Sequence, residues 1–146
     1  MVRHYFGSKE QLFVAALEFP MDPAEAMPRL LEPGLEGLGE RLARFFLETW
    51  DDPKGQPFLA LLRSVAGSDE AAEMLRQFVS HEVVPRLAVA IGADRPELRA
   101  ALAGSQLVGL AMMRYVIHLE PIASADPAEL ARAVGPSIQR YLTDGA

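Results

Sequence analysis

The chain contains no cysteine among its 146 residues, which excludes disulfides, thiolate metal sites and a cysteine nucleophile. Its three histidines are dispersed, with no spacing typical of a metal site. Strict alternation of apolar and polar residues over the length of a strand is also missing, and β-branched residues are sparse. These absences predict one all-α domain that holds neither a metal nor a cofactor.

Positive charge and long apolar runs are also scarce. The net charge of −6 argues against nucleic-acid binding by the chain as a whole, although residues 1–9 carry Arg3, His4 and Lys9 without an acid. The longest weakly charged run, 100–117, contains Arg114 and is too short and too weakly apolar for a membrane span. We therefore expect a buried helix there, no membrane partner and, because no signal-like start is present, a cytoplasmic protein.

Capping residues and helix breakers divide the chain into about seven helices. Asp94 with Glu97 is expected to cap the penultimate helix, Pro85 to kink a long middle helix, and Pro136 to interrupt the last one. The predicted helices span 9–18, 22–31, 35–50, 57–65, 68–91, 95–119 and 126–142.

Signatures of enzymes fail when they are tested against the sequence. His81-Glu82 begins like the zinc motif H-E-x-x-H, but Pro85 occupies the second ligand position. Glycines at 34, 37 and 39 have the reverse of dinucleotide-loop spacing, and no strand precedes them. No serine lies in a G-x-S-x-G elbow. The sequence therefore predicts a protein that is not an enzyme.

The first seventeen residues look like the end of one helix, a turn at Gly7 and a second helix capped by Ser8 with Gln11. They resemble the junction Y-x-H-F-x-S-K-x-x-L that ends the DNA-binding head of TetR-type transcriptional regulators. The resemblance depends on Tyr5, Phe6, Gly7, Ser8, Lys9, Leu12 and Phe13.

This resemblance implies that 1–18 is a remnant of the head with its connecting helix, and that 19–146 binds a ligand and dimerises. Lys9 at a helix N-terminus would lie by a DNA phosphate, with Arg3, His4 and Tyr5 as further backbone contacts. The reading helix survives only as its final turn, so operator DNA is a partner of the full-length protein only. A misplaced start and a lone regulatory domain both remain open for Met1.

The last two predicted helices carry the second resemblance. The helix 95–119 is apolar nearly all round and must be covered on every side, by a second copy or by a monomer core. The segment 119–127 resembles the actinobacterial-type C-terminal domain of TetR-like regulators, which implies a dimeric four-helix bundle. The interface candidates are Leu98, Leu102, Ser105, Gly109, Arg114, His118, Leu130, Val134, Ile138 and Tyr141.

Aromatic and methionine side chains on the middle helices are candidates for an apolar ligand pocket, with plain core packing as the alternative. Histidine and tyrosine among them could orient a ligand. The candidates are Phe45, Phe46, Trp50, Phe58, Met74, Phe78, His81, Met112 and Tyr115. The resulting prediction is a TetR-like regulator, repression being the family's common mode, that binds an unknown small apolar effector. An all-helical ligand-binding or adaptor protein that never touches DNA is the alternative.

Overall fold

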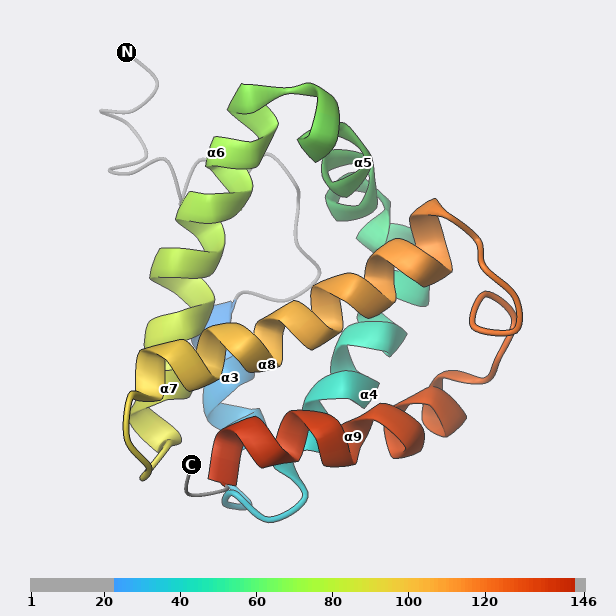
Figure 1. Ribbon diagram of the computed structural model, residues 1–146. Coiled ribbons are helices and arrows are strands. Elements are labelled where there is room, and N and C mark those ends of the chain that lie inside the picture. Colours follow the sequence, from blue (N-terminus) through green and yellow to red (C-terminus); the bar gives the residue numbers. More distant parts are fainter. Residues whose placement is uncertain (1–22, 144–146) are drawn as a thin grey trace.

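The computed structural model describes residues 23–143, and this part of the chain is built from helices without strands (Figure 1). The predicted all-α class is confirmed. The α-helices are α3 Pro23–Leu31, α4 Leu38–Asp51, α5 Gln56–Ser64, α6 Asp69–Phe78, α7 Val84–Ala90, α8 Pro96–Ala111 and α9 Pro127–Thr143. Shorter turns are η1 Pro53–Gly55, η2 Val65–Gly67, η3 Val79–Val83 and η4 Met112–Val116. The predicted helix 9–18 and the DNA-contact candidates Arg3, His4, Tyr5 and Lys9 lie outside the described residues.

Helix α6 begins at a serine cap, close to its predicted start, whereas α4 begins three residues later than predicted. The Ser68 side chain accepts a hydrogen bond from the Ala71 N–H at 3.1 Å, which caps α6. The helix predicted from residue 35 begins only at Leu38, because Gly34 and Gly37 adopt left-handed backbone with φ of 101° and 73°.

The long helix predicted over 68–91 is divided by η3, a π-helical turn that ends two residues before Pro85. Proline has no N–H to donate to the carbonyl four residues earlier, and its ring crowds that carbonyl. The wider π-helical turn η3 accommodates both the missing hydrogen bond and the bulk of the proline ring. A second π-helical turn, η4, follows α8 and ends at Val116, three residues before the predicted end of that helix.

The predicted cap by Asp94 is wrong. Arg95, in left-handed conformation with φ of 48°, occupies the cap position of α8 and makes no side-chain capping bond. The Asp94 carboxylate instead accepts from Arg99 at 3.0 Å, and this lowers the pKa of Asp94. Arg99 is buried and also donates to the carbonyls of Asp94 and Tyr141, which joins the start of α8 to the end of α9.

Helix α9 packs along α4 more extensively than any other pair of helices, and two glycines allow the close approach. A Cβ on Gly39 would lie 2.4 Å from the Gly135 carbonyl oxygen, so neither helix has room for a side chain there. Gln139 accepts from the Gly39 N–H and donates to the Leu35 carbonyl, both at 2.7 Å. Because this contact continues past Pro136, α9 runs to Thr143 without the predicted interruption.

Helix α8 crosses the molecule between the pair α4–α9 and the arm formed by α5 and α6 (Figure 1). The core gathers where α4, α8 and α9 meet. Its most deeply buried large side chains are Leu38, Leu42, Leu47, Leu59, Ile138 and Leu142. Within residues 23–143, none of the helices combines the length and apolarity needed to cross a membrane.

Candidate functional site

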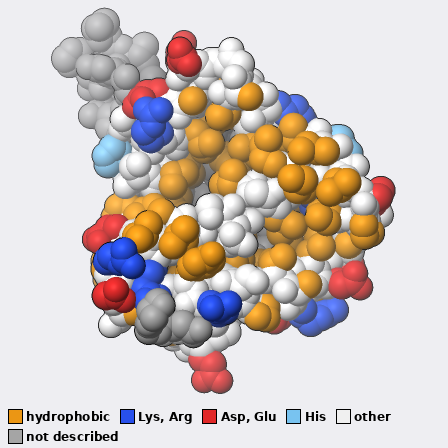
Figure 2. Space-filling model, viewed as in Figure 1, with side chains coloured by type: hydrophobic (Ala, Val, Ile, Leu, Met, Phe, Trp, Pro, Cys, Tyr) orange, Lys and Arg blue, Asp and Glu red, His pale blue; other side chains and the backbone are white. Residues whose placement is uncertain are grey.

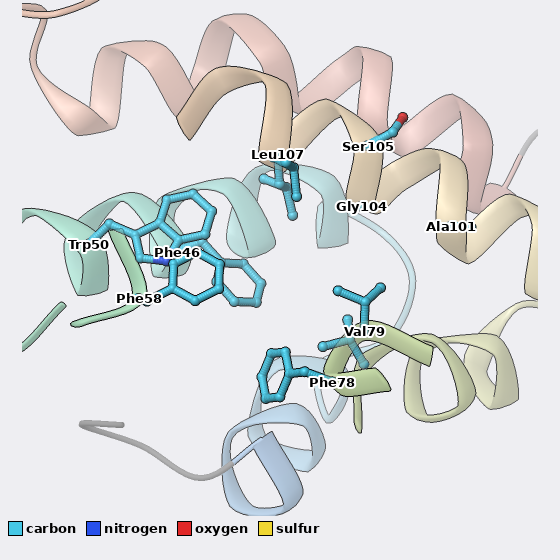
Figure 3. A pocket seen from close by; sticks show the side chains of 11 residues that line it. Phe46, Trp50, Phe58, Phe78, Val79, Ala101, Gly104, Ser105 and Leu107 are labelled. Carbon is cyan, nitrogen blue, oxygen red and sulfur yellow. The ribbon is translucent and has the colours of Figure 1, made fainter. Parts of the chain in front are cut away.

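A cavity of about 300 Å³ lies between α4, α5, the α6–η3 junction and α8 (Figure 3). Among the described residues that line it, none has a charged side chain. The lining residues are Phe46, Trp50, Phe58, Phe78, Val79, Val83, Ala101, Gly104, Ser105, Leu107 and Val108. Size and composition fit a site for a small apolar molecule.

Mutual contacts fix the orientation of the rings on one side of the cavity. Trp50 and Phe58 stack with centroids 5.6 Å apart and planes 3° apart, and Phe46 lies 5.4 Å from Trp50. Tyr115 meets the Trp50 ring edge-on at 6.1 Å from behind the lining. Phe78 lies opposite this cluster, beside Val79 (Figure 3). We refer to Phe46, Trp50 and Phe58 as the aromatic wall.

Helix α8 lines the cavity with three small residues, Ala101, Gly104 and Ser105, and with Leu107 and Val108; we call these five residues the α8 wall. A Cβ built on Gly104 meets no atom within 4 Å, which shows that this part of α8 borders open space. The Ser105 hydroxyl donates to the Leu102 carbonyl at 2.6 Å and points away from the aromatic rings (Figure 3). The α8 wall therefore presents backbone and apolar atoms to the cavity.

Four of the nine pocket candidates line the cavity: Phe46, Trp50, Phe58 and Phe78. The other five lie elsewhere. Phe45 packs edge-on against Phe46, Met74 is half-buried on α6, Met112 packs against the core, Tyr115 lies behind Trp50, and the exposed His81 bonds through Nδ1 with the Gln77 carbonyl. Sequence reasoning did not include the other seven lining residues among the pocket candidates: Val79, Val83, Ala101, Gly104, Ser105, Leu107 and Val108. Small residues on an otherwise apolar helix were the available signal for the α8 wall.

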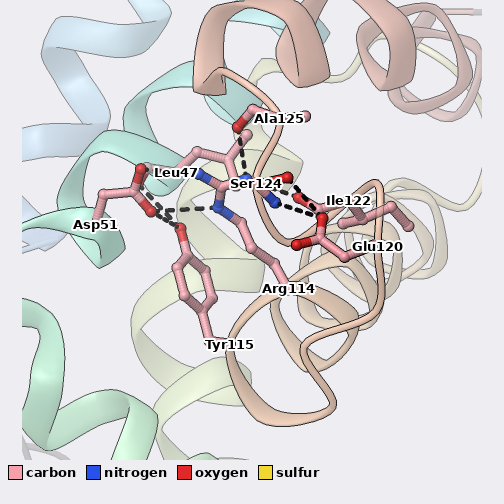
Figure 4. A network of polar contacts seen from close by, with 8 residues as sticks. All are labelled: Leu47, Asp51, Arg114, Tyr115, Glu120, Ile122, Ser124 and Ala125. Carbon is pink, nitrogen blue, oxygen red and sulfur yellow. Dashed lines mark hydrogen bonds and ion pairs between the residues drawn. The ribbon is translucent and has the colours of Figure 1, made fainter.

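A polar network lies behind the aromatic wall and joins α4 to η4 (Figure 4). Arg114 donates to both carboxylate oxygens of Asp51, at 3.3 and 3.1 Å, and to the carbonyls of Ile122 and Ala125, each at 2.8 Å. The single hydrogen of the Tyr115 hydroxyl is shared between Asp51 Oδ1, the nearer acceptor, and the Leu47 carbonyl. Asp51 thus holds two consecutive residues of η4, and Arg114 holds the loop before α9.

Burial and the charge of Asp51 both affect the pKa values of Tyr115 and Arg114. Burial and the hydrogen bond to the negatively charged Asp51 both raise the pKa of Tyr115. Burial opposes the charge of Arg114, but its hydrogen bond and ion pair with Asp51 outweigh that cost and raise its pKa. The network therefore holds Arg114 charged and Tyr115 neutral.

The interface candidates divide according to their exposure in the single protomer. Leu98 is 45% exposed, and Ser105, Gly109 and His118 are also exposed, whereas Leu102, Leu130, Val134 and Tyr141 are half-buried. Arg114 and Ile138 require correction. Ile138 is 0% exposed in the core, and Arg114 is turned inward to Asp51, so neither side chain is available to a second copy.

Further apolar side chains continue the outward face of α8 beyond the helix. Met113 and Ile117 are 38% and 55% exposed, and a Cβ on Gly109 meets no atom within 4 Å. Hydrophobic side chains gather over much of the face of the molecule that includes α8 (Figure 2). We define the α8 outward face as Leu98, Leu102, Gly109, Met113 and Ile117.

Comparisons with known proteins agree with this architecture. The family model for the Tetracyclin repressor-like, C-terminal domain matches residues 36–142. A crystal structure of a TetR-family regulator from Streptomyces coelicolor A3 is similar with a TM-score of 0.71 and 38% sequence identity, over 94% of this chain and 93% of that chain. No curated protein sequence matches significantly. The extent of both matches shows that the chain belongs to the TetR family of transcriptional regulators.

Proposed function

We propose that this chain carries the regulatory part of a TetR-family repressor, which dimerises and binds a small apolar effector. The observation that carries the proposal is the cavity of about 300 Å³, in which every lining side chain of residues 23–143 is uncharged. Apolar side chains on the α8 outward face support dimerisation, because a second copy would remove them from water. The family assignment favours this function over an adaptor that never touches DNA.

Effector binding would act on DNA affinity through two arrangements of the domain. The cavity is bounded by four separate helical segments, so a ligand between them contacts each segment differently when their spacing changes. A ligand shifts such an equilibrium only by its differential affinity for the two arrangements. The connecting helix predicted at 9–18 would transmit the choice to the DNA-binding head.

A dye titration tests the effector site. N-phenyl-1-naphthylamine is uncharged and becomes fluorescent in apolar surroundings, and we expect saturable binding to the wild-type chain. Gly104→Phe places a ring in the cavity without striking another atom at Cβ, and should weaken dye binding at least about tenfold, roughly 1.4 kcal/mol. Unchanged dye affinity in a folded Gly104→Phe chain would contradict the proposed site.

Light scattering tests the dimer with a matched substitution on the same helix. Gly109→Arg also starts from a glycine with open space at Cβ, but Gly109 does not line the cavity. We expect the wild type and Gly104→Phe to be dimers at micromolar concentration and Gly109→Arg to be a monomer that still binds the dye. Val89→Arg, on an 88% exposed side chain of α7, is the control that should remain dimeric. A monomeric wild type would contradict dimerisation.

A further inference from the structure

We infer that the cavity selects uncharged, flat aromatic molecules of about two fused rings over carboxylated, cationic or saturated molecules of the same size. This inference rests on the proposed effector site and specifies the chemistry of its ligand. Three features of the cavity support it: the aromatic wall, the low surface of α8 at Ala101 and Gly104, and the lack of a counter-ion among the described lining residues.

The aromatic wall is a preorganised surface for stacking and edge contacts. Trp50 is 4% and Phe58 is 8% exposed, and their parallel rings hold each other in place. Phe78, 5% exposed, supplies a further ring on the opposite side of the space (Figure 3). Aromatic pairs add about 0.5–1.5 kcal/mol beyond the area that they bury, so an aromatic ligand gains about two- to tenfold over a saturated one.

The α8 wall favours a slab-shaped ligand. Ala101 and Gly104 have little or no side chain, so the surface of α8 is low at these two positions, and Leu107 and Val108 line the cavity farther along the helix. A flat ring can lie against such a surface, whereas the thicker saturated ring system makes fewer close contacts at the same carbon number. A volume of about 300 Å³ accommodates a bicyclic molecule with small substituents.

The described part of the lining offers a charged ligand no counter-ion in place of the water that it loses. Its polar side-chain groups are the Ser105 hydroxyl, which donates its hydrogen to the Leu102 carbonyl, and the uncharged indole N–H of Trp50. The nearby Asp51 and Arg114 are paired with each other behind the aromatic wall. An ammonium would gain a cation–π contact but no counter-ion, and a carboxylate would gain neither.

Competition against bound N-phenyl-1-naphthylamine tests this selectivity on the full chain. The competitors are 2-methylnaphthalene, 2-naphthoate, 2-naphthylmethylammonium and decalin, which share a bicyclic frame. We expect 2-methylnaphthalene to displace the dye at concentrations at least about tenfold below those of either charged compound, and at least about twofold below that of decalin. Equal or better displacement by any of the other three would overturn the inference while leaving the effector site intact. Failure of the dye itself to bind would overturn the proposed function.

A pair of neighbouring phenylalanines provides a matched control. Phe46 lines the cavity and Phe45 does not, and both are half-buried on α4. Phe46→Leu keeps an apolar side chain and should reduce the preference for 2-methylnaphthalene over decalin by about two- to tenfold. Phe45→Leu should leave that preference unchanged. Equal preferences in the two variants would show that the aromatic wall does not select the ligand.

Discussion

Replacement by alanine should have opposite effects on stability at two glycines, Gly104 in open space on α8 and Gly39 in the contact between α4 and α9. Replacing a helical glycine by alanine stabilises an open site by about 1 kcal/mol, because alanine loses less backbone entropy on folding. Gly104 is such a site, since its Cβ would meet no atom within 4 Å. Gly104→Ala should therefore raise the free energy of unfolding by about 0.5–1 kcal/mol.

Gly39→Ala should have the opposite effect. Its Cβ would lie 2.4 Å from the Gly135 carbonyl oxygen and 2.8 Å from the Gln139 nitrogen, and these backbone atoms cannot rotate away. Separating the two helices costs about 1–3 kcal/mol for overpacking and weakens the Gln139 bonds to Gly39 and Leu35, each worth about 1 kcal/mol. After the alanine gain is subtracted, we expect a net loss of about 2 kcal/mol or more.

Urea denaturation followed by circular dichroism measures both variants at one fixed protein concentration, because the proposed dimerisation would contribute to apparent stability. The midpoint should fall for Gly39→Ala and rise for Gly104→Ala. Gly135→Ala, whose Cβ would lie 2.9 Å from Glu40 Cα, should behave like Gly39→Ala. A midpoint for Gly39→Ala at or above that of the wild type would refute the packing argument.

Other predictions concern the polar contacts. The folded-state pKa of Tyr115 is raised, so stability from this group is complete below its unfolded pKa near 10 and is lost as the pH rises above it. Absorbance at 295 nm should show a tyrosine phase above pH 10 that Tyr115→Phe removes; a titration that is the same in Tyr115→Phe would contradict the raised pKa. Arg114→Met removes the ion pair with the partly exposed Asp51 and the hydrogen bonds to the Ile122 and Ala125 carbonyls, and should cost about 2 kcal/mol in urea denaturation, whereas a loss below about 0.5 kcal/mol would show these contacts to be unimportant. Arg41 donates to three backbone carbonyls before α4, so Arg41→Met should lower the free energy of unfolding by about 1–2 kcal/mol. The control Arg44→Met, at an exposed ion pair, should lower it by about 0.5 kcal/mol or less, and equal losses in the two variants would refute the role of Arg41.

Local sequence patterns predicted the helical class and the order of the helices, because caps and apolar periodicity act within a few residues. The Ser68 cap is an example, since donor and acceptor are three residues apart. The predicted cap by Asp94 was wrong because the Asp94 carboxylate accepts from Arg99 instead. Arg99 also donates to the Tyr141 carbonyl at the end of α9, a contact 42 residues away that the local pattern does not contain. Proline also acted differently at two positions, with a break near Pro85 and none at Pro136.

The sequence predicted only the part of the site that local patterns mark. Large aromatic residues marked the aromatic wall, because aromatic side chains on middle helices are candidates for any apolar cavity. The α8 wall includes Gly104, which has no side chain to mark it in the sequence. Its position beside the cavity depends on how α8 passes between the α5–α6 arm and the α4–α9 pair, which local patterns do not predict (Figure 1). Arg114 was placed outward, at the interface, because its partner Asp51 lies 63 residues earlier in the chain.

The central claim is that the cavity beside Trp50 holds an apolar ligand, and energy transfer from this tryptophan tests it most directly. Trp50 is the one tryptophan in the chain and lines the cavity, so its emission has a single origin beside the site. Excitation of Trp50 in the presence of N-phenyl-1-naphthylamine should give saturable dye emission with matching loss of tryptophan emission, and Gly104→Phe should abolish both changes. Dye that binds without quenching Trp50, or quenching that persists in folded Gly104→Phe, would contradict the claim.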